Sequence, residues 1–407
     1  MKAVICGAGI AGLALARRLD ALGWNVVVLE KAPGPRTQGY MVDFFGPGYD
    51  AMEAMGLLPR LTELAYRIDE ASFVDEHGRR RAGLDYTQFS RAVGGRLMSI
   101  MRPDLELALR ETLPPGVDLR FGTGPASIEE TPDEVRVTLV DGSVERADLL
   151  VGADGVHSTV RGLVFGGEAS FLKYRGFHTA AYVFDDPDVF EQVRGRLCLT
   201  DTVDRQMGLY GLRDGRVAAF GVHRSESGDV PRDTREAVRQ AYDGLGWVVP
   251  RALRKCPPSS EVYYDQVAQI VMDRWSRGRT VLVGDAAYAV SLLAGQGASL
   301  GVAGAYVLAE ELGRASSVAA GLAAYEQRWR PVTLDKQEAG RAAAEWFLPA
   351  SPSRLRARRA AMRLSGLPGV GRLVARSLSG KPAVLTRETT SGRRHSGPVS
   401  RSHSGPG

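Results

Sequence analysis

The chain has 407 residues, of which 44% are hydrophobic and 24% charged, and it contains three cysteines. This length and composition predict a globular protein of two or three packed units and exclude collagen-like, broadly disordered and disulfide-built proteins. Because the cysteines are odd in number and lack metal-type spacing, they indicate a reducing compartment. We therefore expect a cytoplasmic protein without a cysteine zinc site.

The formal net charge of +5 is unevenly distributed along the chain. Residues 354–407 contain 12 basic residues and one acidic residue, whereas the rest of the chain contains 40 basic and 46 acidic residues. The body is thus mildly acidic and the tail basic, which argues against a nucleic-acid-binding fold. No apolar run approaches the roughly 20 residues that cross a bilayer.

The first 30 residues predict a βαβ unit. Residues 2–6 and 25–29 have the short apolar runs of buried strands, and residues 10–22 between them have the apolar spacing of a helix. A unit of this kind implies parallel strands joined by a right-handed crossover.

A glycine motif joins the first strand to the helix, because residues 7–12 have the pattern G-x-G-x-x-G. In such a loop Gly7 permits a tight turn, Gly9 lets the backbone approach a pyrophosphate, and Gly12 allows close packing. Glu30 ends the second strand, 18 residues after Gly12, where an acid accepts hydrogen bonds from an adenosine ribose. The unit therefore predicts a dinucleotide site, and the acid disfavours NADP as the bound nucleotide.

The elements beyond this unit change character along the chain. A helix is predicted over 103–113, and strands over 117–121, 135–140 and 148–152. Between about 170 and 275, short alternating runs predict a mostly antiparallel sheet, with strands at 178–184, 196–200, 206–212 and 216–222. A buried strand over 280–284 and a helix over 298–313 follow. Residues 320–378 are predicted helical, with breaks at Pro331, Pro349, Pro352 and Pro368.

Two further motifs specify the dinucleotide. Residues 149–161 contain Gly152-Ala153-Asp154-Gly155, and residues 281–297 contain Gly284-Asp285 and then Gly295-Gln296-Gly297. With the first motif, in this order, the chain resembles the class A FAD monooxygenases of the p-hydroxybenzoate hydroxylase fold over roughly residues 1–340. Segments 30–43, 51–58 and 101–105 look closest to the tetracycline-inactivating subgroup.

The resemblance implies an α/β fold: a Rossmann-like FAD-binding domain of the p-hydroxybenzoate hydroxylase type, an antiparallel-sheet substrate domain and C-terminal helices. The FAD-binding domain would comprise residues 1–70, 96–168 and 277–340, and the substrate domain residues 71–95 and 169–276. Residues 341–378 would form the C-terminal helices and residues 379–407 a disordered basic tail.

The resemblance also implies which residues hold FAD. Asp285 would bind ribityl hydroxyls, Gly295 and Gly297 would leave room for the isoalloxazine ring, and the helix from Ala298 would aim N–H groups at the flavin N1–C2=O edge. The other expected FAD contacts are Gly7, Gly9, Ala11, Gly12, Glu30, Lys31, Asp43, Arg102 and Asp154, and Arg36 would contact the nicotinamide donor. The residues alone leave open a plain turn role for Asp154 and ordinary loop charges for Arg36 and Asp43.

The implied reaction is hydroxylation of an aromatic or polycyclic small molecule with NADPH or NADH and O2, through a flavin C4a-hydroperoxide. The flavin carries this chemistry, so no catalytic side chain is expected. His178 and His223 fall in the predicted substrate sheet, where a structural role is favoured over assistance to a phenol. Two alternatives remain: a flavin-dependent double-bond reductase of the geranylgeranyl-reductase type and a non-catalytic flavin-fold ligand-binding protein.

Substrate contacts are expected from the antiparallel sheet. Because strand residues alternate, Tyr210 and Phe220 cannot both face the same way as Met207 and Leu209. The full set of expected contacts is Tyr182, Met207, Leu209, Tyr210 and Phe220.

The chain departs from the family's usual pattern at four positions. Tyr288 stands where the family often has His, Leu293 and Ala294 stand where it often has two prolines, and Ser299 stands where it often has Asn. These differences would alter the substrate side of the flavin or its mobility.

The basic segment 353–378 has two interpretations. It is favoured to dock on its own acidic protein body rather than on an anionic membrane surface. We expect a monomer or weak dimer.

Overall fold

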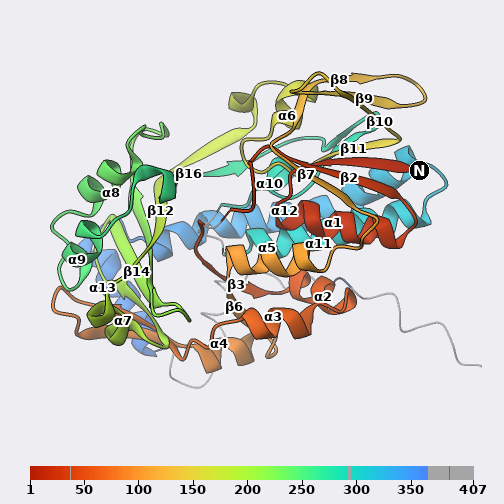
Figure 1. Ribbon diagram of the computed structural model, residues 1–407. Coiled ribbons are helices and arrows are strands. Elements are labelled where there is room, and N and C mark those ends of the chain that lie inside the picture. The colour runs from red at the N-terminus through yellow and green to blue at the C-terminus, as the bar shows by residue number, and fades with distance from the viewer. Residues whose placement is uncertain (37, 292–294, 365–384, 386–407) are drawn as a thin grey trace, which may run out of the picture.

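The computed structural model describes residues 1–36, 38–291, 295–364 and 385. It has two main sheets with helices packed around each, and a long helix, α12, that runs behind both (Figure 1). A helix long and apolar enough to cross a membrane does not occur among these residues.

The first sheet contains the N-terminal βαβ unit. Its strands are parallel except that β17 runs antiparallel to β18. Helices α1 (Ile10–Ala21), α5 (Arg102–Glu111) and α11 (Gly297–Arg314) lie on one side, and a three-stranded sheet of β8 (Pro125–Glu130), β9 (Val135–Leu139) and β10 (Val144–Ala147) lies on the other (Figure 1). The strand order is β17 (Ser276–Arg277), β18 (Thr280–Leu282), β11 (Leu149–Gly152), β1 (Lys2–Cys6), β2 (Asn25–Glu30) and β7 (Asp118–Phe121).

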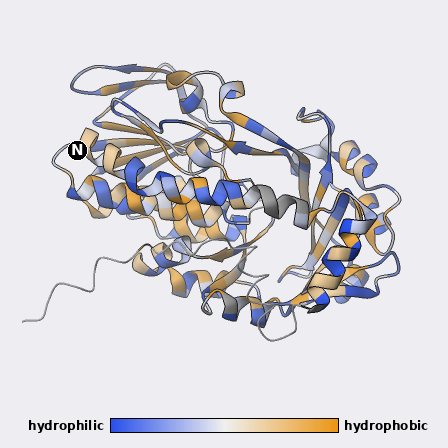
Figure 2. Ribbon diagram, turned by 180° about the vertical axis from the view of Figure 1, so that it is seen from behind, coloured by the Kyte–Doolittle hydropathy of each residue, from blue (hydrophilic) through white to orange (hydrophobic). Residues whose placement is uncertain are grey.

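Uninterrupted apolar runs explain why β1, β2 and β11 form the centre of this sheet. Ala3, Val4 and Ile5 of β1 are completely buried, and most residues of its two neighbours are also buried. A strand covered on both faces needs apolar residues at successive positions rather than at alternate ones. The strands beside the N-terminus are accordingly mostly hydrophobic in Figure 2.

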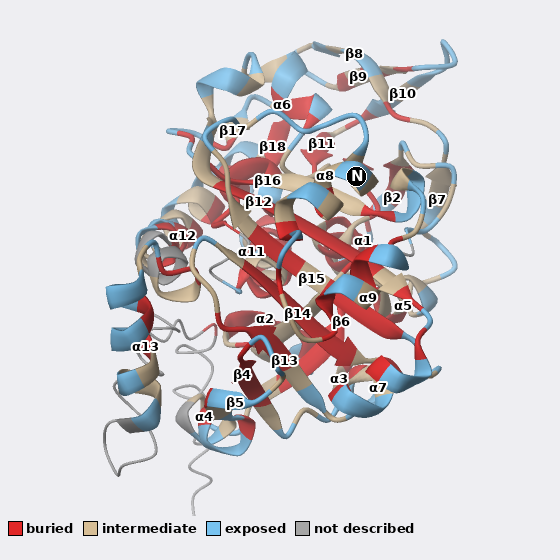
Figure 3. Cartoon of the chain, turned by 90° about the vertical axis from the view of Figure 1, so that its left-hand side faces the viewer, coloured by how far each residue is buried: buried red, intermediate tan, exposed pale blue. Residues whose placement is uncertain are grey.

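The second sheet has seven strands and is antiparallel except where β13 pairs with β4. Its central strands are buried, while the helices around it expose their outer sides (Figure 3). Helices α7 (Pro187–Val193), α8 (Thr234–Tyr242) and α9 (Val249–Arg254) pack on one face. The strand order is β16 (Tyr263–Ile270), β12 (Leu172–Phe184), β15 (Val217–Arg224), β14 (Arg205–Gly211), β13 (Arg196–Thr200), β4 (Glu70–Val74) and β5 (Arg80–Asp85).

Smaller elements connect the two sheets. The antiparallel pair β3 (Met41–Phe45) and β6 (Leu97–Met101) lies between them with helix α2 (Pro47–Ala54). The remaining elements are α3 (Leu58–Leu64), α4 (Tyr86–Ala92), α6 (Thr159–Val164), the 3-10 turns η1 (Glu168–Ser170) and η2 (Ser259–Glu261), α10 (Asp285–Tyr288), α12 (Val318–Phe347) and α13 (Pro352–Leu364).

The predicted elements are present among the described residues, but several further elements, such as β4, β5, β8 and α2, were not predicted. The strands β3 and β6 were missed because each is short and they pair across more than 50 residues of chain. The expected break at Pro331 is wrong, since α12 continues through it. Proline has no N–H to donate to the carbonyl of Gln327, but both residues lie on the exposed side of the helix, where this carbonyl is accessible to solvent. The domain boundaries stay a prediction, although residues 70–85 do join the second sheet.

The basic helix α13 docks on the second sheet through Asp201. Arg358 is 2% exposed, donates to Asp201 Oδ1 at 2.8 Å and to the Phe347 carbonyl at 2.6 Å, and stacks over the ring of Phe73. Arg359 donates to Asp201 Oδ2 at 2.5 Å. The docking interpretation therefore holds for α13, while residues 365–384 and 386–407, including most of the predicted tail, lie outside the described residues.

Replacing the shared carboxylate tests this docking. We expect Asp201→Asn to lower the free energy of unfolding by about 2 kcal/mol, because it leaves a buried guanidinium without its counter-charge. Urea unfolding measures the change, and Asp229→Asn on the exposed surface is the matched control. A change as small as that of the control would contradict the described docking.

Candidate functional site

Two cavities meet at the glycine loop that follows β1. The first has a volume of about 430 Å³ and is lined by Gly7, Glu30, Lys31, Arg36 and Asp154 among others. The second, about 390 Å³, extends from the same loop to the second sheet. Gly9 and Arg102 line both cavities. The expected FAD residues Ala11, Asp43, Asp285, Gly295, Gly297 and Ala298 line the second.

Close packing explains the glycines of the loop. Gly7 has a φ of 110°, and a Cβ there would lie 2.4 Å from the Ala153 carbonyl oxygen. Gly12 lines neither cavity, and its Cβ would lie 2.0 Å from the Gly7 carbonyl oxygen. At Gly9 a Cβ would meet only Arg102 Nη2, at 3.9 Å. The loop is therefore packed behind Gly7 and Gly12 but open at Gly9, where a ligand can approach the backbone.

Carboxylates line the first cavity in fixed positions. Glu30 accepts backbone N–H bonds from Ala8 and Ala32, both at 2.9 Å, and Arg36 Nη2 lies 3.9 Å from its Oε1. Arg36 thus lies in the first cavity, beside Glu30. Asp154 accepts from the hydroxyl of Ser158 and from the N–H of Val160, so it also caps the start of α6. Asp154 therefore both stabilises the turn before α6 and lines the first cavity.

Asp285 and Asp43 are two of the acidic groups that line the second cavity. Asp285 is accessible from the cavity but surrounded by protein, and this burial raises the pKa of its carboxyl group while Arg102 opposes the shift. It accepts no hydrogen bond from the described residues. Asp43 accepts from Tyr86 Oη at 2.8 Å and Ser99 Oγ at 2.7 Å, and burial raises its pKa despite these bonds.

Helix α11 begins at the second cavity. Gly297 and Ala298 in its first turn carry N–H groups that have no partner within the helix. Ser299 Oγ donates to the Phe45 carbonyl at 2.6 Å and accepts from the Gly48 N–H at 2.9 Å, which fixes where the helix starts. Tyr288 is buried beside Tyr325, while Leu293 and Ala294 lie outside the described residues.

Of the five expected substrate contacts, Tyr210 and Phe220 line the second cavity. Tyr210 Oη accepts the N–H of Met41 at 2.7 Å, and burial raises the pKa of this phenol. Phe220 lies 5.3 Å, between ring centroids, from Tyr40, which is itself 5.7 Å from Tyr263. These two cavity-lining tyrosines were not predicted as site residues, although Tyr40 lies in the segment 30–43 that resembles the tetracycline-inactivating subgroup.

The structure corrects the other three expected contacts. Tyr182, Met207 and Leu209 point to the opposite face of the second sheet and pack in a core with residues of α8 and α9. The predicted alternation explains this, because side chains two apart share a face and neighbours do not. His178 and His223 lie on the same face, where they contact the hydroxyls of Tyr264 and Tyr242. Burial there lowers the pKa of His223 to about 4. Their structural role is thus favoured.

Comparison with known proteins identifies the family. A family profile described as FAD binding domain matches residues 1–336. A flavin-dependent monooxygenase of Legionella longbeachae is 30% identical over 323 residues, covering 77% of this chain and 80% of the relative. The chain belongs to the FAD-dependent monooxygenases. This family, its fold and its cofactor FAD agree with the expectations from the sequence.

Two further similarities place this monooxygenase among its relatives. An uncharacterised protein of Mycobacterium tuberculosis is 37% identical over 317 residues, 76% of this chain and 84% of that protein. The crystal structure of the tetracycline destructase Tet(55) is similar with a TM-score of 0.79 and 26% identity, covering 94% of this chain and 98% of that one. Neither the double-bond reductase nor the non-catalytic alternative is favoured by these matches.

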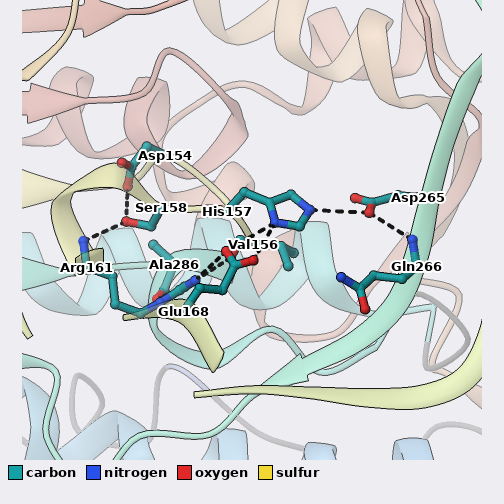
Figure 4. Close-up of polar contacts among 9 residues, drawn as sticks. All are labelled: Asp154, Val156, His157, Ser158, Arg161, Glu168, Asp265, Gln266 and Ala286. Carbon is teal, nitrogen blue, oxygen red and sulfur yellow. Dashed lines mark hydrogen bonds and ion pairs between the residues drawn. The ribbon is translucent and has the colours of Figure 1, made fainter. Parts of the chain in front are cut away.

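Arg161 connects the second and third motifs of the monooxygenase, a role that the sequence analysis missed. It is completely buried and donates to the carbonyls of Ala286 at 2.9 Å and Val156 at 2.6 Å, and to Glu168 Oε2 at 3.2 Å (Figure 4). Ala286 follows Asp285 directly. A single guanidinium therefore holds two cavity-lining segments that lie 125 residues apart.

His157 connects the same region to the second sheet. Its Nδ1 lies 3.1 Å from Glu168 and its Nε2 lies 3.2 Å from Asp265 Oδ1 of β16 (Figure 4). The hydrogen bond to Asp265, with the negative charge of both carboxylates, raises the pKa of His157 to about 9. At neutral pH the ring is therefore an imidazolium between two carboxylates.

This imidazolium makes the stability of the monooxygenase depend on pH. Because its folded pKa lies above the usual value near 6.5, the stabilisation is complete below about pH 6.5 and is lost as the pH rises through about 9. We expect the free energy of unfolding of wild type to exceed that of His157→Gln by about 1 kcal/mol near pH 6 and by almost nothing near pH 10. The effect is small because the ring is 44% exposed and its charge is screened by solvent. Urea unfolding at both pH values checks this. His77→Gln, at an exposed histidine, is the control. A stability difference between wild type and His157→Gln that did not change with pH would contradict the role of the His157 imidazolium.

Proposed function

We propose that this monooxygenase hydroxylates an aromatic or polycyclic small molecule with NADPH or NADH and O2. The observation that supports this most strongly is the second cavity, which joins Asp285 and the start of α11 to Tyr210 and Phe220 on the second sheet. A cofactor held at one end and a ring held at the other would share one enclosed space. Proximity of this kind is the protein's main contribution to flavin chemistry.

The residues present fit FAD. Gly9 leaves the backbone open beside Arg102, as a pyrophosphate requires, and Glu30 lines the adenosine end of the first cavity. Asp285 faces the second cavity with no donor from the described chain, which suits ribityl hydroxyls. The free N–H groups at the start of α11 suit an edge that becomes negative on reduction. When bound, FAD supplies the redox and oxygen-activating chemistry.

The protein itself orients the substrate and excludes water. Tyr210 and Phe220 provide aromatic surface on the second sheet, and Phe347 at the end of α12 also lines the cavity. Contact of Arg36 with the nicotinamide donor stays a prediction, since its side chain lies beside Glu30 in the first cavity.

We also propose that the monooxygenase is a cytoplasmic monomer or weak dimer. The three cysteines are free and buried, which fits a reducing compartment.

Turnover with a panel of polycyclic phenols, including a tetracycline, tests the proposed function. Purified protein should carry the visible absorbance of bound FAD, and NADPH or NADH oxidation with O2 uptake should rise when a substrate is added. The product should be heavier by one oxygen atom in mass spectrometry. Reduction of bound FAD by NAD(P)H without any oxygenated product across the panel would instead favour the double-bond reductase.

A further inference from the structure

Strand β16 presents a carboxylate to the second cavity. Its residues Tyr263, Asp265, Gln266, Val267 and Ala268 line this cavity, and Tyr263, Asp265 and Val267 share one face of the strand because they are two residues apart. On the neighbouring strand β12, Thr179 pairs with Asp265 and lines the same cavity. Asp265 lies on the sheet that carries Tyr210 and Phe220, and it belongs to none of the three FAD motifs. Its carboxylate thus lies on the substrate side of the cavity.

The two oxygens of Asp265 differ in their contacts. Oδ1 accepts the N–H of Gln266 at 2.8 Å and lies 3.2 Å from His157 Nε2 (Figure 4). Oδ2 has no hydrogen-bond donor in the part of the chain that the structure describes, and the side chain is 18% exposed. One oxygen is therefore held by the protein while the other is available to a ligand.

We propose that Asp265 determines substrate specificity: Oδ2 accepts a hydrogen bond from a hydroxyl or amino group of the substrate, and the negative charge disfavours substrates that carry a carboxylate at that place. This inference rests on the proposed function, because it requires an aromatic substrate in the second cavity. A hydrogen bond to a charged acceptor is stronger than one between neutral groups, and repulsion between like charges is less screened in an enclosed cavity than in water.

His157 is the positioning residue for Asp265. It contacts Oδ1, and its other ring nitrogen is held by Glu168, which also accepts from Arg161. The raised pKa of the imidazole keeps it protonated at neutral pH, so that it donates to both carboxylates. His157 and Glu168 do not line either cavity. The arrangement fixes the carboxylate plane and thereby the direction of Oδ2.

Three bicyclic probes that differ in one substituent test the proposal: 2-naphthol, 2-methoxynaphthalene and 2-naphthoate. Each is titrated into full-length protein loaded with FAD, and the dissociation constant is read from the change in the flavin visible spectrum. Wild type should bind 2-naphthol about tenfold more tightly than either of the other two probes, since only 2-naphthol donates a hydrogen bond without adding negative charge.

Substitutions at Asp265 separate the two effects. Asp265→Leu should bind 2-naphthol and 2-methoxynaphthalene equally, because the acceptor is gone. Asp265→Asn should keep the preference for 2-naphthol over 2-methoxynaphthalene but lose about tenfold discrimination against 2-naphthoate, because it removes the negative charge of residue 265 and keeps an oxygen that can accept a hydrogen bond. Asp243→Asn, an exposed residue next to α8, is the control and should behave as wild type.

Substitutions at His157 test positioning rather than folding. His157→Ala should reduce the preference for 2-naphthol over 2-methoxynaphthalene about threefold, whereas His157→Gln, which can still donate to Asp265, should restore it. A purely structural role would change melting temperature in both variants without changing this ratio.

FAD content and NADPH-driven reduction are recorded first on the same samples. Wild type that fails either measurement would overturn the proposed function itself. Wild type that passes both but shows no preference for 2-naphthol would overturn the role of Asp265. So would an Asp265→Leu variant that keeps this preference.

Discussion

Gly7→Ala is expected to weaken FAD binding by at least about 100-fold, roughly 3 kcal/mol. The new Cβ would lie 2.4 Å from the Ala153 carbonyl oxygen and 2.6 Å from its carbonyl carbon, both backbone atoms that cannot rotate away. The φ of 110° is also a strained backbone conformation for alanine. The loop must then move away from Ala153, and the opening at Gly9 moves with it.

Visible absorbance and equilibrium dialysis of FAD measure this loss. Gly162→Ala is the matched control, since it adds the same methyl group to helix α6 with nothing within 4 Å and no positive φ. That variant should keep wild-type FAD affinity. If Gly7→Ala also kept it, the close packing of the loop against Ala153 would not govern cofactor binding.

Arg161→Met should lower the free energy of unfolding by about 4 kcal/mol. Methionine fills much of the buried space but leaves the carbonyls of Ala286 and Val156 without donors, each at a cost of about 1–3 kcal/mol. Burial lowers the pKa of Arg161, although Glu168 and Asp154 oppose the shift. The guanidinium is therefore held against a desolvation cost, as expected when its hydrogen bonds join two segments.

Urea unfolding measures this change, and FAD affinity should fall in parallel because Ala286 follows Asp285. Arg161→Lys should recover only part of the loss, since an ammonium group cannot span both carbonyls and the carboxylate. Arg274→Met on the exposed surface is the control. A loss below about 1 kcal/mol would show that the two segments hold their positions without Arg161.

Local patterns explain which parts of the site were predictable. The glycine loop, Glu30 and Asp285 follow strand ends within short motifs, so spacing along the chain fixes their positions. His157 and Asp265 are 108 residues apart, and their contact depends on how the two sheets are oriented. The periodicity of the sequence does not predict how two sheets are oriented relative to each other.

The expected substrate contacts show what strand alternation cannot predict within one sheet. Alternation correctly separates Tyr210 from Met207 and Leu209 on the same strand, but it does not say which face meets the cavity. That choice depends on where α8 and α9 pack, since they cover the face that carries Met207 and Leu209. An apolar strand is equally compatible with either face until those helices are placed.

The contact between Gly48 and the backbone of Ser299 leaves no room for a side chain at position 48. A Cβ at Gly48 would lie 2.5 Å from Ser299 Cα, and the short serine hydroxyl bridges Gly48 and Phe45. Engineering the asparagine common in the resembled family into position 299 would therefore require the segment around Gly48 to be transplanted with it. In natural sequences of this lineage, position 48 should stay glycine whichever side chain stands at position 299, and comparison of genome sequences can check this without any purified protein.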